Sequence, residues 1–158
     1  MTTPRIKTAA LFLSIATLQV AAFTLIPLGS VHAQEPAPDT ASVTVTFTGI
    51  QSPTGAIMAG VYDSETAFAG GAPMKGLRIE ITGGEATVVV TGLKPGQYGI
   101  KAYHDIDGDG RMGTNPFGMP TEPYAASNNA RGEMGPPAWA DAVFEAAAGE
   151  TAQTITID

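Results

Sequence analysis

Apolar and polar residues alternate along most of the chain after residue 42, and this period of two predicts half-buried β-strands. In the stretch SVTVTFTG, Val43, Val45 and Phe47 share one face and three threonines share the other. The other candidate strands are AIMAGVYD, LRIEI, EATVVVTG, QYGIKAYH, DAVFEA and QTITID. About seven short strands without a long helical pattern predict an all-β fold, namely an antiparallel β-sandwich.

Glycine and proline pairs supply the turns that this pattern requires. Gly83-Gly84 suits a tight hairpin between LRIEI and EATVVVTG. Pro95-Gly96 suits the two central positions of a type II turn, in which the second residue needs a positive φ. A short helix is expected over SETAF, with Ser64 as its N-cap.

The segment 115–139 has no period and is rich in proline, glycine and asparagine. A loop of this length inside a compact domain is usually functional or disordered. Its large apolar residues argue against disorder, so we expect it to fold back over the sandwich and to bury most of Trp139. These residues are Phe117, Tyr124, Met134 and Trp139.

The first 33 residues have the pattern of a signal peptide. Arg5 and Lys7 form a positive start, an apolar run follows, and Val31 and Ala33 supply the small residues of a signal-peptidase site. Pro27 and several polar residues interrupt the run, which argues against an uncleaved membrane anchor. We therefore expect cleavage after Ala33 and export to the periplasm or the cell exterior, with no membrane span in the mature chain.

The expected mature chain consists of a flexible, proline-rich leader over 34–41 and a single domain over 42–158. It keeps six basic and fifteen acidic residues, a net charge of −9. Such a charge argues against nucleic acid as a partner, since phosphates require a basic surface. The chain contains no cysteine, so a disulfide framework and a lipid anchor on cysteine are both excluded.

The stretch YHDIDGDGRMG places Asp105, Asp107 and Asp109 at alternate positions of a glycine-rich turn. Together with Gly110 and the carbonyl of Arg111, they match the first half of the calcium loop D-x-[DN]-x-[DN]-G. Hard carboxylate oxygens at this spacing can converge on one Ca²⁺ ion, whereas without a cation they repel one another. The sequence therefore predicts a Ca²⁺ site in this loop.

The second half of this motif departs from the calcium loop, because Gly113 and Pro116 stand where further ligands are expected. The segment is therefore not an EF-hand, and Glu122 is the carboxylate that we expect to complete the metal shell. The alternative interpretation is a solvated acidic turn, since aspartate and glycine are ordinary turn residues. We expect His104 to be a structural residue at the strand end, hydrogen-bonded to the loop.

Five stretches in this order resemble the DUF2141 family of exported bacterial proteins: GAIMAGVYD, LKPGQYGIKAYHDIDGDG, NPFGMPTEPY, SNNARG and GPPAWADAVF. The resemblance implies a β-sandwich of the transthyretin-like or carboxypeptidase-regulatory kind, and it names no reaction. The residues here that correspond to the loop H-D-x-N-x-N-G of the family are His104, Asp105, Asp107, Asp109 and Gly110. This chain departs from the family at Gly113, where an acidic residue is common, and at Ala125-Ala126, where a glycine and an aromatic residue are favoured.

Three classes of function fit these features. The first, which we expect, is a non-catalytic module whose aspartate-rich loop is organised by Ca²⁺. The second is a hydrolase with a glycosidase-like carboxylate pair drawn from Glu122, Glu133 and Asp141. A single mature histidine, no cysteine and no nucleophile motif argue against it. The third is a module that binds carbohydrate or a cell surface through Tyr124 and Trp139.

Overall fold

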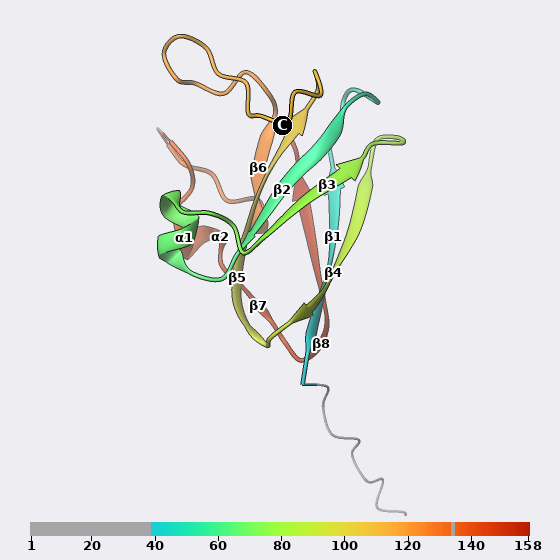
Figure 1. Ribbon diagram of the computed structural model, residues 1–158, viewed down its shortest axis with the longest axis vertical. Coiled ribbons are helices and arrows are strands. Elements are labelled where there is room, and N and C mark those ends of the chain that lie inside the picture. The colour runs from blue at the N-terminus through green and yellow to red at the C-terminus, as the bar shows by residue number, and fades with distance from the viewer. Residues whose placement is uncertain (1–38, 134) are drawn as a thin grey trace, which may run out of the picture. The chain divides into compact units, whose positions relative to one another are not determined.

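The computed structural model describes residues 39–133 and 135–158. The predicted signal peptide, most of the predicted leader and Met134 therefore lie outside the described residues. The described part of the chain folds into two β-sheets that pack face to face (Figure 1). The prediction of an all-β sandwich is confirmed.

The two sheets contain three and five strands. The smaller sheet has the order β4-β1-β8, with β1 over Ala41–Thr48, β4 over Ala86–Leu93 and β8 over Gly149–Thr156. The larger sheet has the order β3-β2-β5-β6, and β7 also pairs with β5. Its strands are β2 over Ala56–Tyr62, β3 over Lys75–Glu80, β5 over Gly96–Asp105, β6 over Tyr124–Ala126 and β7 over Phe144–Ala146.

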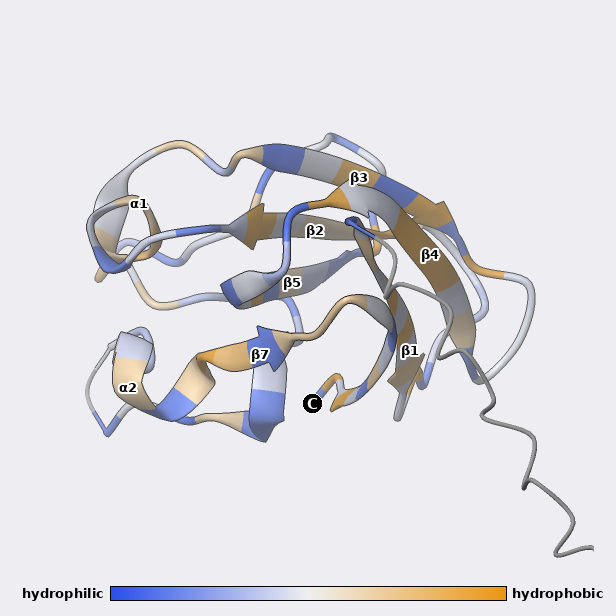
Figure 2. Ribbon diagram, turned by 90° about the horizontal axis from the view of Figure 1, so that it is seen from below, coloured by the Kyte–Doolittle hydropathy of each residue, from blue (hydrophilic) through white to orange (hydrophobic). Residues whose placement is uncertain are grey.

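The core lies between the sheets and is built by the predicted alternation of residues. Val43, Val45 and Phe47 on β1 are at most 1% exposed, while the threonines between them are only partly buried. Ile57 and Ile100 from the larger sheet meet them in the same cluster. Figure 2 shows apolar residues spaced along β1, β2 and β4. Removal of these side chains from water is the main term that stabilises the sandwich.

One strand pair is parallel. Strand β8 runs in the same direction as β1, in register from Ala41 opposite Gly149 to Thr48 opposite Thr156. Every other strand pair is antiparallel among the described residues. The last strand therefore closes the smaller sheet beside the first, and this pairing of distant strands is not visible in the local pattern.

Both turns that the sequence predicted between strands are different in the structure. Strands β3 and β4 belong to different sheets, so Gly83-Gly84 lies in a connection that crosses the sandwich, and the hairpin prediction is wrong. Strands β4 and β5 are also in different sheets. Gly96 has a φ of +158°, whereas a type II turn requires about +80° at this position. The type II prediction is therefore also wrong, because local turn signals do not specify which sheet the next strand joins.

The helical segments are short. They are α1 over Glu65–Gly70, the 3₁₀ turn η1 over Ser127–Asn129 and α2 over Trp139–Ala142. The predicted helix after Ser64 is present, although the Ser64 side chain makes no capping hydrogen bond. Within the described residues, no helix is long and apolar enough to cross a membrane.

Only part of the segment 115–139 folds back over the sandwich. Trp139 is partly buried and packs edge-on against Phe68, with ring centroids 5.5 Å apart, in a second cluster outside the main core. Phe117 is 91% exposed and Met119 is 61% exposed. The expectation that the whole segment covers the sandwich is therefore wrong for this part, which projects from the sheet.

The stretch Ser127-Asn128-Asn129 fixes the middle of the segment 115–139 to both sheets. The Ser127 hydroxyl donates to the carbonyl of Ala142 at 2.5 Å and accepts the amide of Ile100 at 2.9 Å. The Asn129 side-chain oxygen accepts the amide of Thr156 at 2.7 Å. Both asparagines have a positive φ, which asparagine tolerates better than most residues. This stretch is therefore a structural clamp.

Candidate functional site

Strand β5 ends at Asp105, whose carboxylate is fully buried and shapes the loop that follows. Its Oδ1 atom accepts the amide of Gly108 at 2.9 Å, and its Oδ2 atom accepts the amide of Gly110 at 3.0 Å. Both glycines have a φ of +77°, a conformation that costs glycine little and other residues much more. Asp105 therefore folds the loop around its own carboxylate.

Asp107 and Asp109 stand on the exposed side of the same loop. Asp107 Oδ1 accepts the amide of Asp109 at 3.1 Å, and Asp109 Oδ1 accepts the amide of Arg111 at 2.7 Å. Carboxylate oxygens of Asp105, Asp107 and Asp109 all lie within 4.8 Å of one another. Each such oxygen has a second lone pair, so the amide contacts leave these atoms able to coordinate a cation.

Glu122 holds the two ends of the aspartate loop together. Its Oε1 atom accepts the amide of Ile106 at 2.9 Å, and its Oε2 atom accepts the amide of Gly113 at 2.9 Å. A Cβ atom on residue 113 would lie 2.7 Å from the Thr121 hydroxyl, so a larger residue there would require the Thr121 side chain to move. Glu122 lies outside the cluster of the three aspartates among the described residues. The metal-ligand roles of Glu122 and of the Arg111 carbonyl stay predictions.

A cation on another strand contacts this group of carboxylates. Arg78 on β3 has its Nη1 atom 3.6 Å from Asp105 Oδ2, and its Nε atom bonds to Glu80. The surplus of negative charge acts on Tyr103, which precedes the loop on β5. Burial raises the pKa of Tyr103, and the nearby charges of Asp105 and other loop carboxylates raise it further. The loop therefore concentrates negative charge at one place.

His104 is 1% exposed and has a structural role. Its Nε2 atom lies 2.7 Å from the carbonyl oxygen of Thr54, in the loop before β2. The partner loop is therefore the one before β2 rather than the aspartate loop. At the next position, a Cβ atom on Gly55 would lie 1.9 Å from the Asp105 carbonyl oxygen, so this close approach of the two strands requires glycine.

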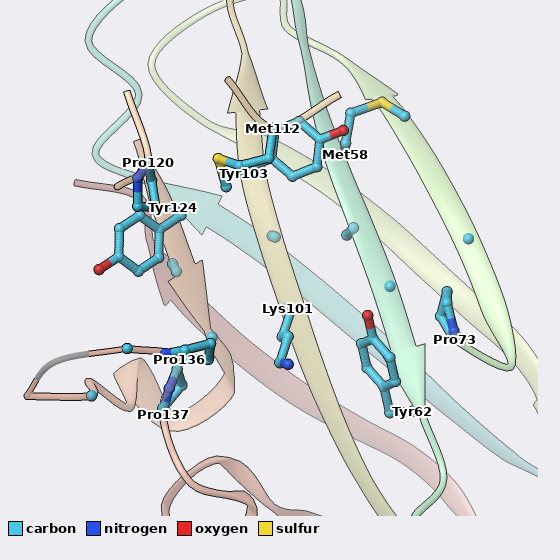
Figure 3. Close-up of a pocket in the computed structure, with 18 of the residues that line it drawn as sticks. Met58, Tyr62, Pro73, Lys101, Tyr103, Met112, Pro120, Tyr124, Pro136 and Pro137 are labelled. Atoms are coloured by element: carbon cyan, nitrogen blue, oxygen red, sulfur yellow. The ribbon is translucent and has the colours of Figure 1, made fainter. Parts of the chain in front are cut away.

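A groove of about 980 Å³ lies over the outer face of the larger sheet. Strand residues Met58, Lys101 and Tyr103 lie along its floor, and the segments 117–120 and 135–137 lie at its sides (Figure 3). No prediction from the sequence included this groove. A signal was present, because the strand AIMAGVYD is apolar on both faces and so exposes Met58 and Tyr62 on the outer face.

Lys101 is a partly buried cation in this groove. Its ammonium donates to the carbonyl of Phe68, and Nζ lies 4.3 Å from the centroid of the Phe68 ring and 5.5 Å from that of Tyr62. Desolvation by these neighbours lowers the pKa of Lys101. The described residues offer Lys101 no carboxylate within salt-bridge distance.

Residues 45–154 match the family described as an uncharacterized protein conserved in bacteria, DUF2141. The protein belongs to the DUF2141 family. The matched residues include the aspartate loop, the residues that line the groove and at least part of every strand. Among curated proteins and among solved structures, none matches the chain.

The residues proposed for a hydrolase, and those proposed for a module that binds carbohydrate or a cell surface, do not lie together at one site in this DUF2141 protein. Both carboxylate oxygens of Glu122 accept backbone amides, while Glu133 lies at the groove and Asp141 is exposed on α2. Tyr124 lines the groove, whereas Trp139 packs against Phe68 and is not part of that lining. Tyr124 therefore belongs with the groove and Trp139 with the second cluster.

Proposed function

We propose that this DUF2141 protein is an exported, non-catalytic binding module, in which the aspartate loop holds Ca²⁺ and the groove holds a ligand. The observation that carries the proposal is the continuity of the two features. The chain that leaves the aspartate loop, from Met112 to Pro120, lines the groove at five positions. A cation that fixes the loop therefore also fixes one side of the groove.

The donor set of the loop supports Ca²⁺ as the cation. Three carboxylates converge, and among the described residues Arg78 is the only cation within salt-bridge distance of one of them. Calcium accepts six to eight oxygen ligands in irregular geometry, whereas Mg²⁺ needs a near-ideal octahedron. A loop that matches only half of the calcium motif suits the larger and more tolerant ion.

The contacts of the acid–base residues near the loop support a non-catalytic role. A general acid or base needs a free atom within hydrogen-bond reach of a substrate. Protonation of Glu122 would weaken its hydrogen bonds to the amides of Ile106 and Gly113, and His104 is buried against Thr54. These side chains maintain the loop and the strand ends. Export is supported by the N-terminal pattern, with cleavage after Ala33.

The proposal is tested by thermal unfolding in EGTA, in excess Ca²⁺ and in excess Mg²⁺ at constant ionic strength. At a hundredfold excess over Kd, binding adds roughly 2.7 kcal/mol to the free energy of unfolding. For a domain of this size, the midpoint then rises by something on the order of ten degrees. Constant ionic strength is needed because any divalent ion screens a chain with this excess of acidic residues.

We expect Asp107→Ala and Asp109→Ala each to reduce the Ca²⁺ shift. Asp63→Ala is the matched control, because Asp63 is exposed and lies outside the loop. Equal small shifts in Ca²⁺ and Mg²⁺ that persist in Asp107→Ala would mean that the loop is only a solvated turn.

A further inference from the structure

The charge of the groove differs from that of the domain around it. Residues 39–158 contain fourteen acidic and six basic side chains. The groove reverses this balance, since Arg78 and Lys101 line it with Glu133 as its only acidic residue among those described. An anionic ligand is favoured where a cation of this lining is not already neutralised by a carboxylate.

Lys101 is the cation that is free to meet such a ligand. Arg78 is already paired with Glu80 and Asp105, whereas the described residues give Lys101 no carboxylate. The ammonium has three N–H donors and uses one of them on the carbonyl of Phe68. Figure 3 draws this ammonium between Tyr62 and the Pro136-Pro137 segment, within the groove.

The remainder of the lining is apolar and aromatic. Tyr62, Tyr103 and Tyr124 come from three different strands, and Phe117, which is 91% exposed, also lines the groove. A concave site lined mostly by apolar and aromatic side chains with a few polar groups is typical of small-molecule binding sites. The volume of about 980 Å³ lies at the upper end of the range of about 300–1,000 Å³ for small-molecule sites.

We infer that the groove binds a small organic anion with a flat apolar body. The anionic group pairs with the ammonium of Lys101, and the body lies against the tyrosine rings and Phe117. The inference rests on the proposed function, since it specifies the ligand of the same groove. Charge-assisted hydrogen bonds are stronger than neutral ones, so the anionic group provides selectivity over a neutral molecule of the same shape.

Two fluorescent probes with the same ring system test the charge preference. The anion is 8-anilinonaphthalene-1-sulfonate, and its neutral counterpart is N-phenyl-1-naphthylamine. Titration of the mature protein in Ca²⁺ is expected to show saturable binding of the sulfonate, tighter by about tenfold than binding of the amine. Lys101→Met should remove this difference and leave binding of the neutral probe unchanged.

Two further variants locate the site. Lys94→Met removes an exposed lysine outside the groove and should change neither titration. Phe117→Ser alters a side chain that is almost fully exposed, so it should preserve the fold and weaken the binding of both probes. Thermal unfolding of each variant excludes binding of the dye to partly unfolded protein.

The possible outcomes distinguish a wrong ligand class from the absence of a binding site in the groove. Equal affinity for both probes, unchanged in Lys101→Met but weakened in Phe117→Ser, would overturn the anion inference and keep the groove as a binding site. Absence of binding by either probe, or affinities that Phe117→Ser leaves unchanged, would overturn both the inference and the ligand-binding part of the proposed function.

Discussion

The Oδ2 atom of Asp105 lies 3.6 Å from the Nη1 atom of Arg78, so the buried carboxylate of the aspartate loop contacts a cation that lines the groove. The same oxygen accepts the amide of Gly110 at 3.0 Å. Loop, sheet and groove therefore meet at one carboxylate. Removal of this carboxylate is expected to have the largest effect of any single change in the loop.

Asp105→Ala should lower the free energy of unfolding by about 2–3 kcal/mol, because the amides of Gly108 and Gly110 lose their acceptors. Asp105→Asn should lower the free energy of unfolding by less, since an amide side chain keeps one acceptor oxygen. Urea unfolding in EGTA measures both values without a contribution from metal. Asp63→Ala serves as the control, and a loss for Asp105→Ala no larger than for this control would contradict the role of Asp105.

Glu122→Ala should speed hydrogen exchange at the amides of Ile106 and Gly113, because each donates to one oxygen of this carboxylate. Glu122→Gln keeps one acceptor and should protect only one of the two amides. Exchange measured by NMR in EGTA separates this clamp from any metal contact. Unchanged exchange at both amides in Glu122→Ala would show that the clamp does not hold the loop.

The Ca²⁺ affinity of the same variant decides the predicted ligand role of Glu122. If Glu122 completes the metal shell, Glu122→Ala should weaken Ca²⁺ binding as strongly as Asp107→Ala does. If it only holds the two ends of the loop together, the loss should be smaller. Isothermal titration with Ca²⁺ distinguishes these two results.

Binding of Ca²⁺ should lower the pKa of Tyr103. Burial and then the charges of Asp105, Glu122 and Asp109 hold this pKa above 10.0, and a bound cation offsets the charges. Because the folded-state pKa is raised, the free energy of unfolding falls as the pH rises above 10.0, and Ca²⁺ should reduce that fall. The difference in tyrosinate absorbance between the wild type and Tyr103→Phe reports the titration. A Tyr103 pKa that rises in Ca²⁺ would place the ion elsewhere.

Gly99→Ala should destabilise the second cluster. A Cβ atom at residue 99 would lie 2.8 Å from the Trp139 ring and 3.0 Å from the Phe68 ring, and overpacking of this kind costs about 1–3 kcal/mol. Trp139 should then shift its emission to longer wavelength as it leaves Phe68. Gly76→Ala is the matched control on a strand, since nothing lies within 4 Å of the added atom. Equal unfolding midpoints for the two variants would contradict this packing.

Mass spectrometry of the protein from its own cells should find Gln34, or its pyroglutamate, as the first residue. The reason is the small residue Ala33 at the end of the apolar run. A cell-associated chain that still begins at Met1 would contradict export by a cleaved signal peptide.

The sequence by itself determined most of the strands and the cluster of aspartates, although β6 lies in the segment without a period and α2 includes the first residues of the expected strand DAVFEA. The side chains of a strand point alternately to opposite faces, so the alternation of Val43, Val45 and Phe47 predicts both the strand and its buried face. The three aspartates are within five residues of one another, so a tight turn is enough to bring their carboxylates together. Both results depend only on local geometry.

Only the tertiary structure decided which strands pair and where the groove lies. The parallel pairing of β1 and β8 joins residues 108 positions apart, and no local pattern encodes such a partner. The clamp by Glu122 and the position of Lys101 between Phe68 and Tyr62 likewise need contacts between separate segments. Periodicity shows which side chains share a face, but the free energy of packing selects what covers that face.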